Sequence, residues 1–505
     1  MTSHKKRWAK LDTERNFVLK RGRDCAALTI PSLLPPAGSN ENSNLVTPYQ
    51  GMGARGVNNL SSKLLLALLP PNSPFFRQKL DKGEARKAGM KDADFTEVEK
   101  VLAEIEKMIM DEIEGMALRV SVFEAIRYLV TTGNALMFLN AVKERLKVYR
   151  LDQYVVKRDP FGMVLEIIVK EEVTPLALPE SVRQNVIDVQ KNIDTPVEMY
   201  TRVLRTDTHW KVSQEVNGII IPESLGTYRF DDCPWIPLRW MGLHGEDYGR
   251  GLVEEHLGDL RSLESLSMTI VEGSAAMSKI LFLVNPNGVT SQRTVAQSEN
   301  GAVKPGRKDD VTVMQVDKAM DFRVAGETVN EIKKNLAQVF MLNSAVQRQG
   351  ERVTAEEIRF MARELEDTLG GVYSLLSLEL QLPLLKLVKK QMEKKQKLPK
   401  LPEKATKIVI TTGLEALGRT HDVERLQLFL NDLEPVSDVA MQYLIMGTYI
   451  KKAAIARGID VENLIKDEET VVAERQQAQM MALMEKGVGP VAGNVTKGMT
   501  DNGEN

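Results

Sequence analysis

Two helical segments separated by a short strand-like insertion constrain the fold of this chain more than any other feature. Apolar residues recur at helical spacing from Leu252 to Ile280 and again from Glu327 to Phe340. At a rise of ~1.5 Å per residue, the first segment alone would be about 40 Å long. Residues 291–316, between the two segments, have the short apolar runs and turn residues of a small β structure. The pattern predicts a stalk of two long helices with a small tip.

A polar loop, residues 343–353, follows the second of these helices. It contains Arg348 and Arg352 but no proline. Thr354 and Glu357 form a capping box, which predicts that another helix begins there. The apolar residues of this helix continue to Leu376, past a Gly370-Gly371 pair that interrupts it. On pattern alone the loop is a solvated helix–loop–helix tip, because most polar loops lie at the surface.

The N-terminal half of the chain is predicted to be helical at first and then rich in strands. Helices are expected over residues 5–30 and 54–69, from Thr96, and from a second capping box that begins at Ser121. From residue 134 to about 235 the apolar spacing changes to two, which predicts strands joined by turns. A short strand after Pro402, a helical segment and a Gly-rich, disordered end of about 20 residues complete the chain. The predicted class is α+β, mainly helical.

Composition excludes several classes of protein. The formal net charge is -2, so a nucleic-acid surface would have to come from local segregation of charge. Basic runs at the N-terminus and over residues 386–407 are interpreted as solvated helix faces. Cys25 and Cys233 are the only cysteines, which favours a reducing compartment over a disulfide framework or a zinc site. We find no signal peptide and no uncharged apolar window near ~18 residues, and therefore predict no membrane insertion.

A glycine pattern at residues 51–56 matches the dinucleotide-binding fingerprint. Gly51, Gly53 and Gly56 have the G-x-G-x-x-G spacing and open a predicted helix. A dinucleotide site also needs a preceding strand within a βαβ unit, and neither is present in the sequence. Close helix packing explains these glycines better.

A second pattern, at residues 301–308, resembles a phosphate-binding loop. The sequence lacks the two residues that bind the phosphates and the magnesium ion. Arg307 stands at the position of the lysine, and Lys308 stands at the position of the Ser or Thr hydroxyl. The segment is therefore interpreted as a turn.

No combination of residues in the sequence has the spacing of a catalytic or metal site. The acidic and histidine residues of 244–256 could be assembled into a metal site on paper, but their spacing matches no known ligand pattern. Acidic residues at a helix start also stabilise its dipole. We predict no enzymatic activity and no cofactor.

Five stretches of this sequence, taken together, resemble the portal proteins (head-to-tail connectors) of short-tailed double-stranded DNA bacteriophages. They occur in the order of the family and cover most of the chain up to about residue 420, with a looser match beyond. The stretches are TPYQGMGARGVNNLSSKLLLALLPPNSPFF (47–76), TGNALMFL (132–139), LDQYVVKRDPFGMVLEIIV (151–169), WIPLRWMGLHGEDYGRGLVEEHLGDLRSLESLS (235–267) and RVTAEEIRFMARELEDTLGGVYSLLSLELQLPL (352–384).

The resemblance implies a portal fold with a wing, a two-helix stem, a clip and a helical crown. In this family twelve copies assemble as a ring at one capsid vertex, around a channel for DNA. The implied division of this chain is an N-terminal wing part (1–251, with the β-rich region 134–235), stem helix 1 (252–284), clip (285–316), stem helix 2 (317–342), channel loop (343–353), long wing helix and short strand (354–412), crown (413–485) and disordered tail (486–505).

The resemblance also implies partners and contact residues. Residues expected to face DNA in the channel loop are Asn343, Ser344, Gln347, Arg348, Gln349 and Arg352. Residues expected to dock the packaging motor or the tail are Arg293, Lys304, Arg307 and Lys308 of the clip. Expected partners are other copies of the chain, double-stranded DNA, the major capsid protein, the scaffolding protein, the terminase large subunit, the tail adaptor and internal core proteins. The expected location is the virion, after assembly in the host cytoplasm.

Two other functions compete with this interpretation. A different structural ring of the virion, such as a tail adaptor, would have a shorter stalk. An NTP-driven DNA translocase would need the phosphate-binding lysine and hydroxyl that residues 301–308 lack. A channel that passes DNA should not hold it by many phosphate contacts, and a near-neutral chain with a few loop arginines fits that requirement.

Overall fold

The computed structural model describes most of the first 410 residues. The described ranges are 3–40, 42–71, 74–87, 95–190, 194–277, 281–299, 301–314, 319–342, 365, 368–398 and 406–410. The chain divides into two units, Met1–Gly413 and Leu414–Asn505. All described residues belong to the first unit, so the predicted crown and disordered tail lie outside them.

The predicted single helix over residues 5–30 is wrong, because two helices occupy this segment. Helix α1 spans His4–Glu14 and α2 spans Asn16–Ala27, and they are separated at Arg15. The Arg15 side chain is buried, and its guanidinium donates to the carbonyl oxygens of Leu151 and Tyr154. Since a buried cation needs such acceptors, the break in the helix follows from the position of Arg15.

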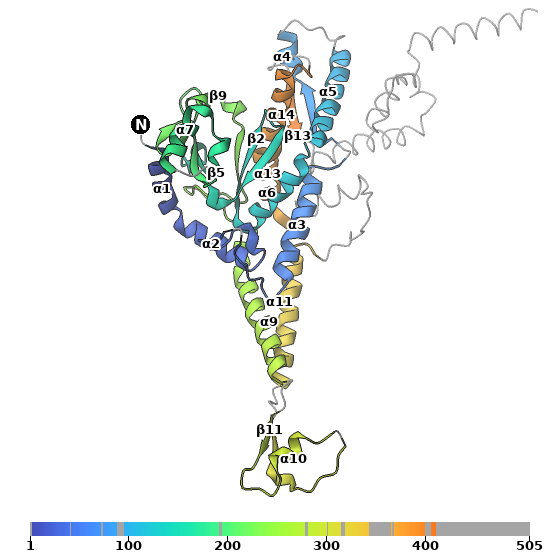
Figure 1. Ribbon diagram of the computed structural model, residues 1–505. Coiled ribbons are helices and arrows are strands. Elements are labelled where there is room, and N and C mark those ends of the chain that lie inside the picture. Colours follow the sequence, from blue (N-terminus) through green and yellow to red (C-terminus); the bar gives the residue numbers. More distant parts are fainter. Residues whose placement is uncertain are drawn as a thin grey trace, which may run out of the picture. The chain divides into compact units, whose positions relative to one another are not determined.

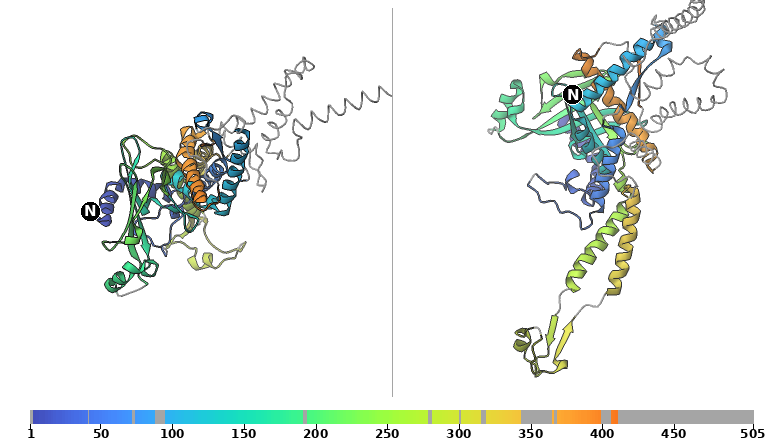
Figure 2. Two further views of the ribbon diagram at one scale, coloured as in Figure 1. Left: turned by 90° about the horizontal axis from the view of Figure 1, so that it is seen from above. Right: turned by 90° about the vertical axis from the view of Figure 1, so that its right-hand side faces the viewer.

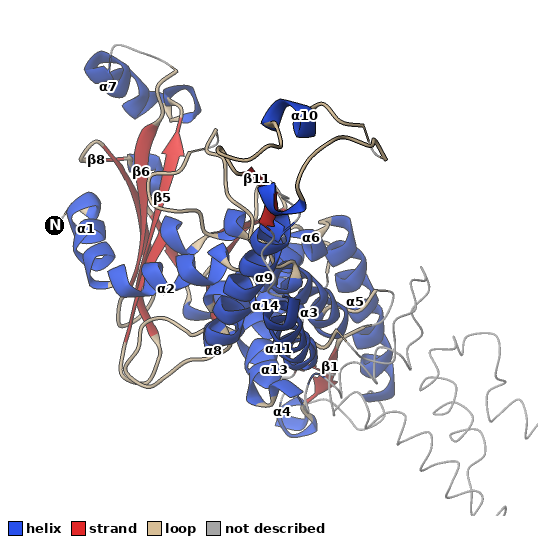
Figure 3. Ribbon diagram, turned by 90° about the horizontal axis from the view of Figure 1, so that it is seen from below, coloured by secondary structure: helices blue, strands red, loops and turns tan. Residues whose placement is uncertain are grey.

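Helix α1 lies against one side of the six-stranded sheet (Figure 3). Glu215 of that sheet accepts hydrogen bonds from the Ser3 hydroxyl (2.6 Å) and from the His4 backbone N–H (2.7 Å). Glu166 lies between Arg7 of α1 and Arg202 of the sheet and pairs with both. Buried carboxylates therefore fix the first helix by its free N–H groups and its basic side chains.

A layer of helices follows. Its elements are η1 (Pro31–Leu33), α3 (Met52–Leu68), α4 (Lys82–Lys87), α5 (Phe95–Gly115) and α6 (Leu118–Thr132), with strand β1 (Phe76–Leu80) paired antiparallel to β13 (Thr406–Ile410). The predicted helices at 54–69 and from Thr96, and the strand after Pro402, are confirmed.

The predicted cap at Ser121 is wrong. Helix α6 begins at Leu118, and the Ser121 hydroxyl donates instead to the Leu146 carbonyl oxygen at 2.9 Å.

The predicted change to strands at Asn134 is confirmed. The strands are β2 (Asn134–Asn140), β3 (Arg145–Tyr149), β4 (Tyr154–Arg158), β5 (Val164–Val173), β6 (Val197–Arg205), β7 (Trp210–Val216), β8 (Ile219–Ile220), β9 (Gly226–Tyr228) and β10 (Trp235–Arg239). They form a three-stranded sheet in the order β10-β2-β3 and a six-stranded sheet in the order β4-β5-β6-β7-β8, with β9 also paired to β7. All of these pairs are antiparallel, and α7 (Glu180–Gln190) connects β5 to β6. Short helices η3 (Leu151–Gln153), η4 (Pro175–Ala177), η5 (Pro222–Ser224) and η6 (Phe230–Asp232) lie in the connections.

The segment before β2 and the segment after β10 meet in close backbone contact. Gly133 ends α6 with a φ of +75°, and a Cβ there would lie 2.5 Å from the backbone nitrogen of Gly251. The buried Asn134 side chain donates to the Gly249 carbonyl oxygen (2.8 Å) and accepts from the Gly249 N–H (2.7 Å). Gly133, Gly249 and Gly251 lie in two of the stretches that resemble portal proteins, and this close backbone contact explains why these positions have no side chain.

Two long antiparallel helices follow the sheets. The first begins as α8 (Leu252–Glu255), which is separated at His256 from the longer α9 (Leu257–Met277). The second, α11 (Ala319–Val339), lies beside α9 (Figure 1; Figure 2, right). Leu260 and Leu263 of α9 and Leu336 of α11 are buried in one core. At the other end of the pair, Phe322 packs on Gly273, where a Cβ would lie 2.5 Å from the ring atom Cε1 and still closer to Cζ. The predicted stalk of two helices is confirmed, except that its first helix is interrupted at His256.

The predicted helix after Leu365 is interrupted. Gly370 has a φ of +54°, and α13 (Gly371–Leu376) leads through a π-helical turn, η8 (Ser377–Gln381), into α14 (Leu382–Lys394). The prediction that no segment could span a membrane was too broad, because Gly371–Lys394 is long and apolar enough to do so. Eight of its apolar residues nevertheless belong to the protein core, whereas Leu378 is exposed; the buried ones are Tyr373, Leu376, Leu380, Leu384, Leu385, Leu387, Val388 and Met392.

The basic run that begins at Lys386 is largely neutralised by acidic residues of other elements. Lys386 pairs with Asp231 and Lys390 pairs with Asp232, both in η6. Lys397 pairs with Glu112 of α5. Lys386 and Lys397 are exposed, as predicted for a solvated face, and their ion pairs also connect α14 and the residues after it to neighbouring elements.

Candidate functional site

The tip predicted between the two long helices is a small β structure. Strand β11 (Leu281–Val284) pairs antiparallel with β12 (Val311–Met314), and α10 (Gln292–Ala296) and η7 (Lys308–Asp310) lie in the segment that joins them. We refer to residues 281–314 as the clip segment. The prediction that residues 281–284 continue the first stem helix is wrong. Their backbone groups pair with β12 instead, which suits the apolar, β-prone sequence Leu-Phe-Leu-Val.

One buried carboxylate organises the clip segment. A single oxygen of Asp310, Oδ2, accepts hydrogen bonds from the Val289 N–H (2.9 Å), the Thr290 N–H (3.0 Å) and the Thr290 hydroxyl (2.9 Å). The Thr290 hydroxyl in turn accepts from the Arg307 N–H at 2.9 Å. A Cβ on Gly288 would lie 2.5 Å from the Asp310 carboxyl carbon, so this close approach requires a glycine. The cluster connects the two halves of the segment across about 20 residues of chain.

Asp310 makes the clip segment sensitive to acid. The hydrogen bond from the Thr290 hydroxyl, followed by those from two backbone N–H groups, lowers the pKa of Asp310 from its ordinary value. Since the folded pKa is below the unfolded one, the carboxylate stabilises the segment above about pH 4. That contribution is lost as the pH falls from there through the folded pKa.

We expect Asp310→Asn to reproduce the acid-induced loosening at neutral pH. Without the charge, exchange of the Val289 and Thr290 amide hydrogens should rise about tenfold, since hydrogen bonds to a charged group are the stronger ones. Hydrogen exchange with mass spectrometry measures this. Asp309→Asn is the control, because Asp309 is exposed and adjacent. Equal exchange in the two variants would contradict the role given to Asp310.

The four cations predicted to dock a partner all lie in the clip segment. Arg293 is in α10, Lys304 and Arg307 are in the connecting chain, and Lys308 begins η7. All four side chains are exposed, and within the described residues none forms an ion pair. Val303, between them in the chain, is 97% exposed. The segment therefore presents these four cations and an apolar side chain to solvent, together with the exposed Glu299 and Asp309.

The phosphate-loop pattern of residues 301–308 is a turn and a coil, as predicted. No helix follows Gly306; the 3-10 turn η7 and strand β12 come next. Gly301 has a φ of +83°, and a Cβ on Gly306 would lie 2.8 Å from the Thr290 hydroxyl. These glycines therefore serve a turn and a close approach within the clip segment.

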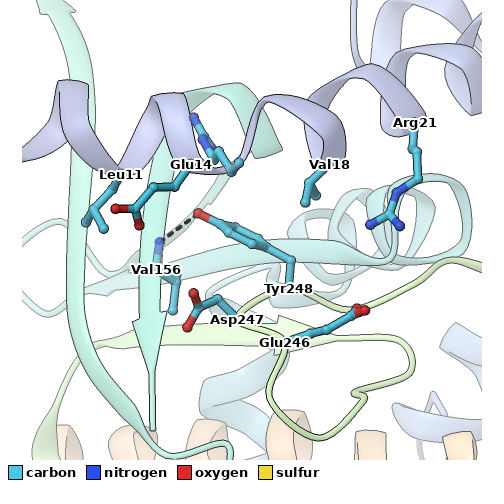
Figure 4. Close-up of a pocket in the computed structure, with 9 residues that line it drawn as sticks. Leu11, Glu14, Val18, Arg21, Val156, Glu246, Asp247 and Tyr248 are labelled. Atoms are coloured by element: carbon cyan, nitrogen blue, oxygen red, sulfur yellow. Dashed lines mark hydrogen bonds between the residues drawn. The ribbon is translucent and has the colours of Figure 1, made fainter. Parts of the chain in front are cut away.

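A hollow with a volume of about 200 Å³ lies in the N-terminal part of the fold (Figure 4). It lies where α1 and α2 meet strand β4, and its wall includes Arg15, Arg21 and Tyr248. The Tyr248 hydroxyl accepts from the Val156 N–H (3.1 Å), and Asp247 accepts from the Arg158 N–H (2.7 Å). These residues cover the free edge of β4, which would otherwise be available for unwanted strand pairing.

The acidic residues considered for a metal site are held in ion pairs. Glu246 and Glu254 pair with Arg250, and Asp247 pairs with Lys157. Within the described residues, no group of three or more His, Cys, Asp or Glu side chains is arranged to hold a metal ion.

The predicted channel-loop residues Asn343, Ser344, Gln347, Arg348, Gln349 and Arg352 lie outside the described residues. The structure describes the helix that leads to them, which closes at Met341 and Leu342. Thr290 and Asp310 were not predicted from the sequence, because an aspartate and a threonine twenty residues apart match no motif. The Asn-Pro-Asn-Gly turn at 285–288 was the one signal that this part of the segment folds back.

Comparison with known proteins gives extended matches. The family described as "Bacteriophage head to tail connecting protein" matches residues 2–465. The portal protein of Escherichia phage T7 is 40% identical over 494 residues, which cover 96% of this chain and 92% of the T7 protein. The portal protein of Enterobacteria phage T3 is 41% identical over 480 residues (94% and 89%), and that of Enterobacteria phage SP6 is 28% identical over 496 residues (96% and 94%). A chain from the neck of a native GTA particle aligns with 74% of this chain at 11% identity and a TM-score of 0.33.

Proposed function

Since this chain belongs to the bacteriophage head to tail connecting protein family, we propose that it is the portal protein of a short-tailed phage, a structural component that connects head and tail and carries the channel for DNA. The observation that carries this proposal is the match at 40% identity to a curated portal protein over nearly the whole of both chains. The chain acts as a structural protein rather than an enzyme, and its location is the virion, at the junction of head and tail.

The described elements can be assigned to the parts of a portal subunit. Helices α9 and α11 are the stem, the clip segment is the clip, and the sheets with α1–α7 and α13–α14 are the wing. The crown corresponds to residues 413–485. Twelve copies form a ring around a central channel, at one vertex of the capsid. The antiparallel helix pair with a β insertion between its members supports this assignment.

Exposed apolar side chains on the stem support assembly of several copies. On α9, Met268 and Val271 are 41% and 53% exposed, and Val324 on α11 is 59% exposed. In a ring each stem has a neighbour on both sides, and apolar residues on outward faces would be covered there.

The clip docks the terminase large subunit during packaging and the tail adaptor afterwards. The exposed cations Arg293, Lys304, Arg307 and Lys308 and the exposed Val303 support a docking role for this segment. The wing contacts the major capsid protein and the scaffolding protein, and internal core proteins lie on the head side of the ring. DNA passes along the channel past the loop 343–353.

Replacing Arg348 and Arg352 by alanine together should leave ring assembly intact and impair DNA packaging or retention. The reason is that the two guanidinium groups are the charges of this loop that can contact phosphates. Ring assembly is measured by electron microscopy and DNA content by the yield of filled heads. The matched control is Lys143→Ala with Arg145→Ala, an exposed basic pair in the wing. Wild-type yields of filled heads in the loop variant would refute the role of the loop.

A further inference from the structure

Helix α3 crosses the carboxyl end of stem helix α11 at very short range. A Cβ on Gly56 would lie 2.5 Å from the ring atom Cδ2 of Phe340, which is completely buried, and still closer to Cγ. Gly53, one turn earlier, approaches Thr29, whose methyl carbon would lie 3.1 Å from a Cβ. The expectation that the glycines of residues 51–56 serve close packing is confirmed for Gly53 and Gly56 but not for Gly51, where a Cβ would meet no atom within 4 Å. The packing brings the next two turns of α3 beside the last carbonyl groups of α11.

Two side chains of α3 bind those carbonyl groups. The Asn59 amide donates to the carbonyl oxygens of Phe340 (3.0 Å) and Met341 (3.1 Å), and the Lys63 ammonium donates to that of Met341 (2.8 Å). Gly56, Asn59 and Lys63 are three and four residues apart, so they share one face of α3. The carbonyl groups at the end of a helix have no partner within it, and here α3 supplies the partners.

The end of α11 contains backbone strain that these contacts offset. The Leu342 N–H donates to the Ala337 carbonyl oxygen (2.8 Å) and the Met341 N–H donates to that of Gln338 (3.0 Å), the pattern of a Schellman motif. The left-handed residue of this motif is commonly glycine, but here it is Met341, at a φ of +55°. A residue with a side chain is unfavourable in this conformation and persists only where its surroundings hold it.

Lys63 is suited to holding this end. Its side chain is buried, with 8% of the residue exposed, and a buried ammonium needs compensating groups. The carboxyl end of a helix carries partial negative charge, which is where a cation is stabilising. The lysine therefore stabilises the helix end, and the helix end stabilises the buried charge.

We infer that Asn59 and Lys63 are positioning residues that hold the closed end of α11 and thereby fix the point from which the DNA-facing segment starts at residue 343. The effect on the channel rests on the proposed function, whereas the contacts of Asn59 and Lys63 with the end of α11 do not depend on it. It assigns to the α3 stretch GVNNLSSK a role in the channel, although α3 lies nearly 300 residues earlier in the chain.

Lys63→Met tests the inference, because it keeps the length of the side chain and removes the charge. We expect hydrogen exchange of the amides of residues 339–342 to rise on the order of tenfold to a hundredfold, the effect of losing a hydrogen bond from a charged donor. Two controls should change little: hydrogen exchange in the middle of α9 and the melting temperature of the protein. Lys63→Arg, which retains the charge, should restore most of the protection.

A double-mutant cycle with Met341→Gly separates positioning from general packing. Glycine adopts the left-handed conformation without strain, so the closed end should depend less on Lys63 in that background. The increase in exchange caused by Lys63→Met should then be several-fold smaller than in the wild-type background. Equal increases in both backgrounds, or unchanged exchange in Lys63→Met alone, would overturn the inference.

Yields of filled heads, measured on the same variants, distinguish this inference from the proposed function. Raised exchange in Lys63→Met together with a reduced yield supports both. A second outcome is raised exchange in Lys63→Met together with normal yields of filled heads in both Lys63→Met and the Arg348→Ala, Arg352→Ala variant. That outcome supports the positioning contacts and refutes the channel role of the loop. A reduced yield with unchanged exchange overturns the positioning role.

Discussion

Replacing Gly133 by alanine should lower the free energy of unfolding of the first unit by about 2–5 kcal/mol, which for many domains is a large part of the total. Two effects add. The φ of +75° costs a residue with a Cβ about 1–2 kcal/mol. The Cβ would also press into the backbone of Arg250 and Gly251, 2.5 Å from the Gly251 nitrogen, and neither backbone can move without breaking the Asn134–Gly249 pair.

Gly218→Ala is the matched control for this effect. Gly218 has nearly the same backbone angle, a φ of +82°, but no atom lies within 4 Å of the position that a Cβ would take there. It should therefore cost only the conformational term of about 1 kcal/mol. Denaturant-induced unfolding measures the two values. Similar losses in the two variants would show that close approach of the two chain segments is not what Gly133 provides.

Replacing Val271 by aspartate should abolish ring assembly while leaving the single chain folded. Val271 is 53% exposed on α9, and a substitution at such a site changes the stability of the chain itself by about 0.5 kcal/mol or less. In a ring the same position would be covered by the neighbouring stem. An unpaired charge buried there costs roughly 3 kcal/mol or more, and the cost recurs at every interface. Size-exclusion chromatography with light scattering measures the oligomeric state.

Val142→Asp provides the control for the stem variant. Val142 is 92% exposed in the turn between β2 and β3, so the substitution makes the same chemical change away from the stem. It should assemble as the wild type does. If Val271→Asp also assembled normally, α9 would not form the contact between copies at this position.

The parts of the fold that follow from local pattern were predictable. The two long helices α9 and α11, the β-rich insertion after Asn134 and the strand at residues 406–410 all follow from apolar periodicity. The errors have one physical origin, which is that tertiary contacts override local preference. Arg15 interrupts a helical segment because the distant carbonyl oxygens of Leu151 and Tyr154 bind it, and residues 281–284 are a strand because β12 pairs with them.

In the candidate site, tertiary contacts were even harder to predict from the sequence than in the rest of the fold. The exposed cations of the clip were accessible to sequence reasoning because charge is visible in the sequence. The residues that hold the described parts in place, Asp310 and Lys63, were not, because their partners are backbone groups far away in the chain. Backbone acceptors are present at every residue and leave no compositional trace.

Electron microscopy of the purified full-length protein tests the proposed portal function most directly. A portal subunit should give closed rings of twelve copies with a central channel and a stem. Particles that remain single chains under all assembly conditions, or rings that enclose no channel, would contradict it.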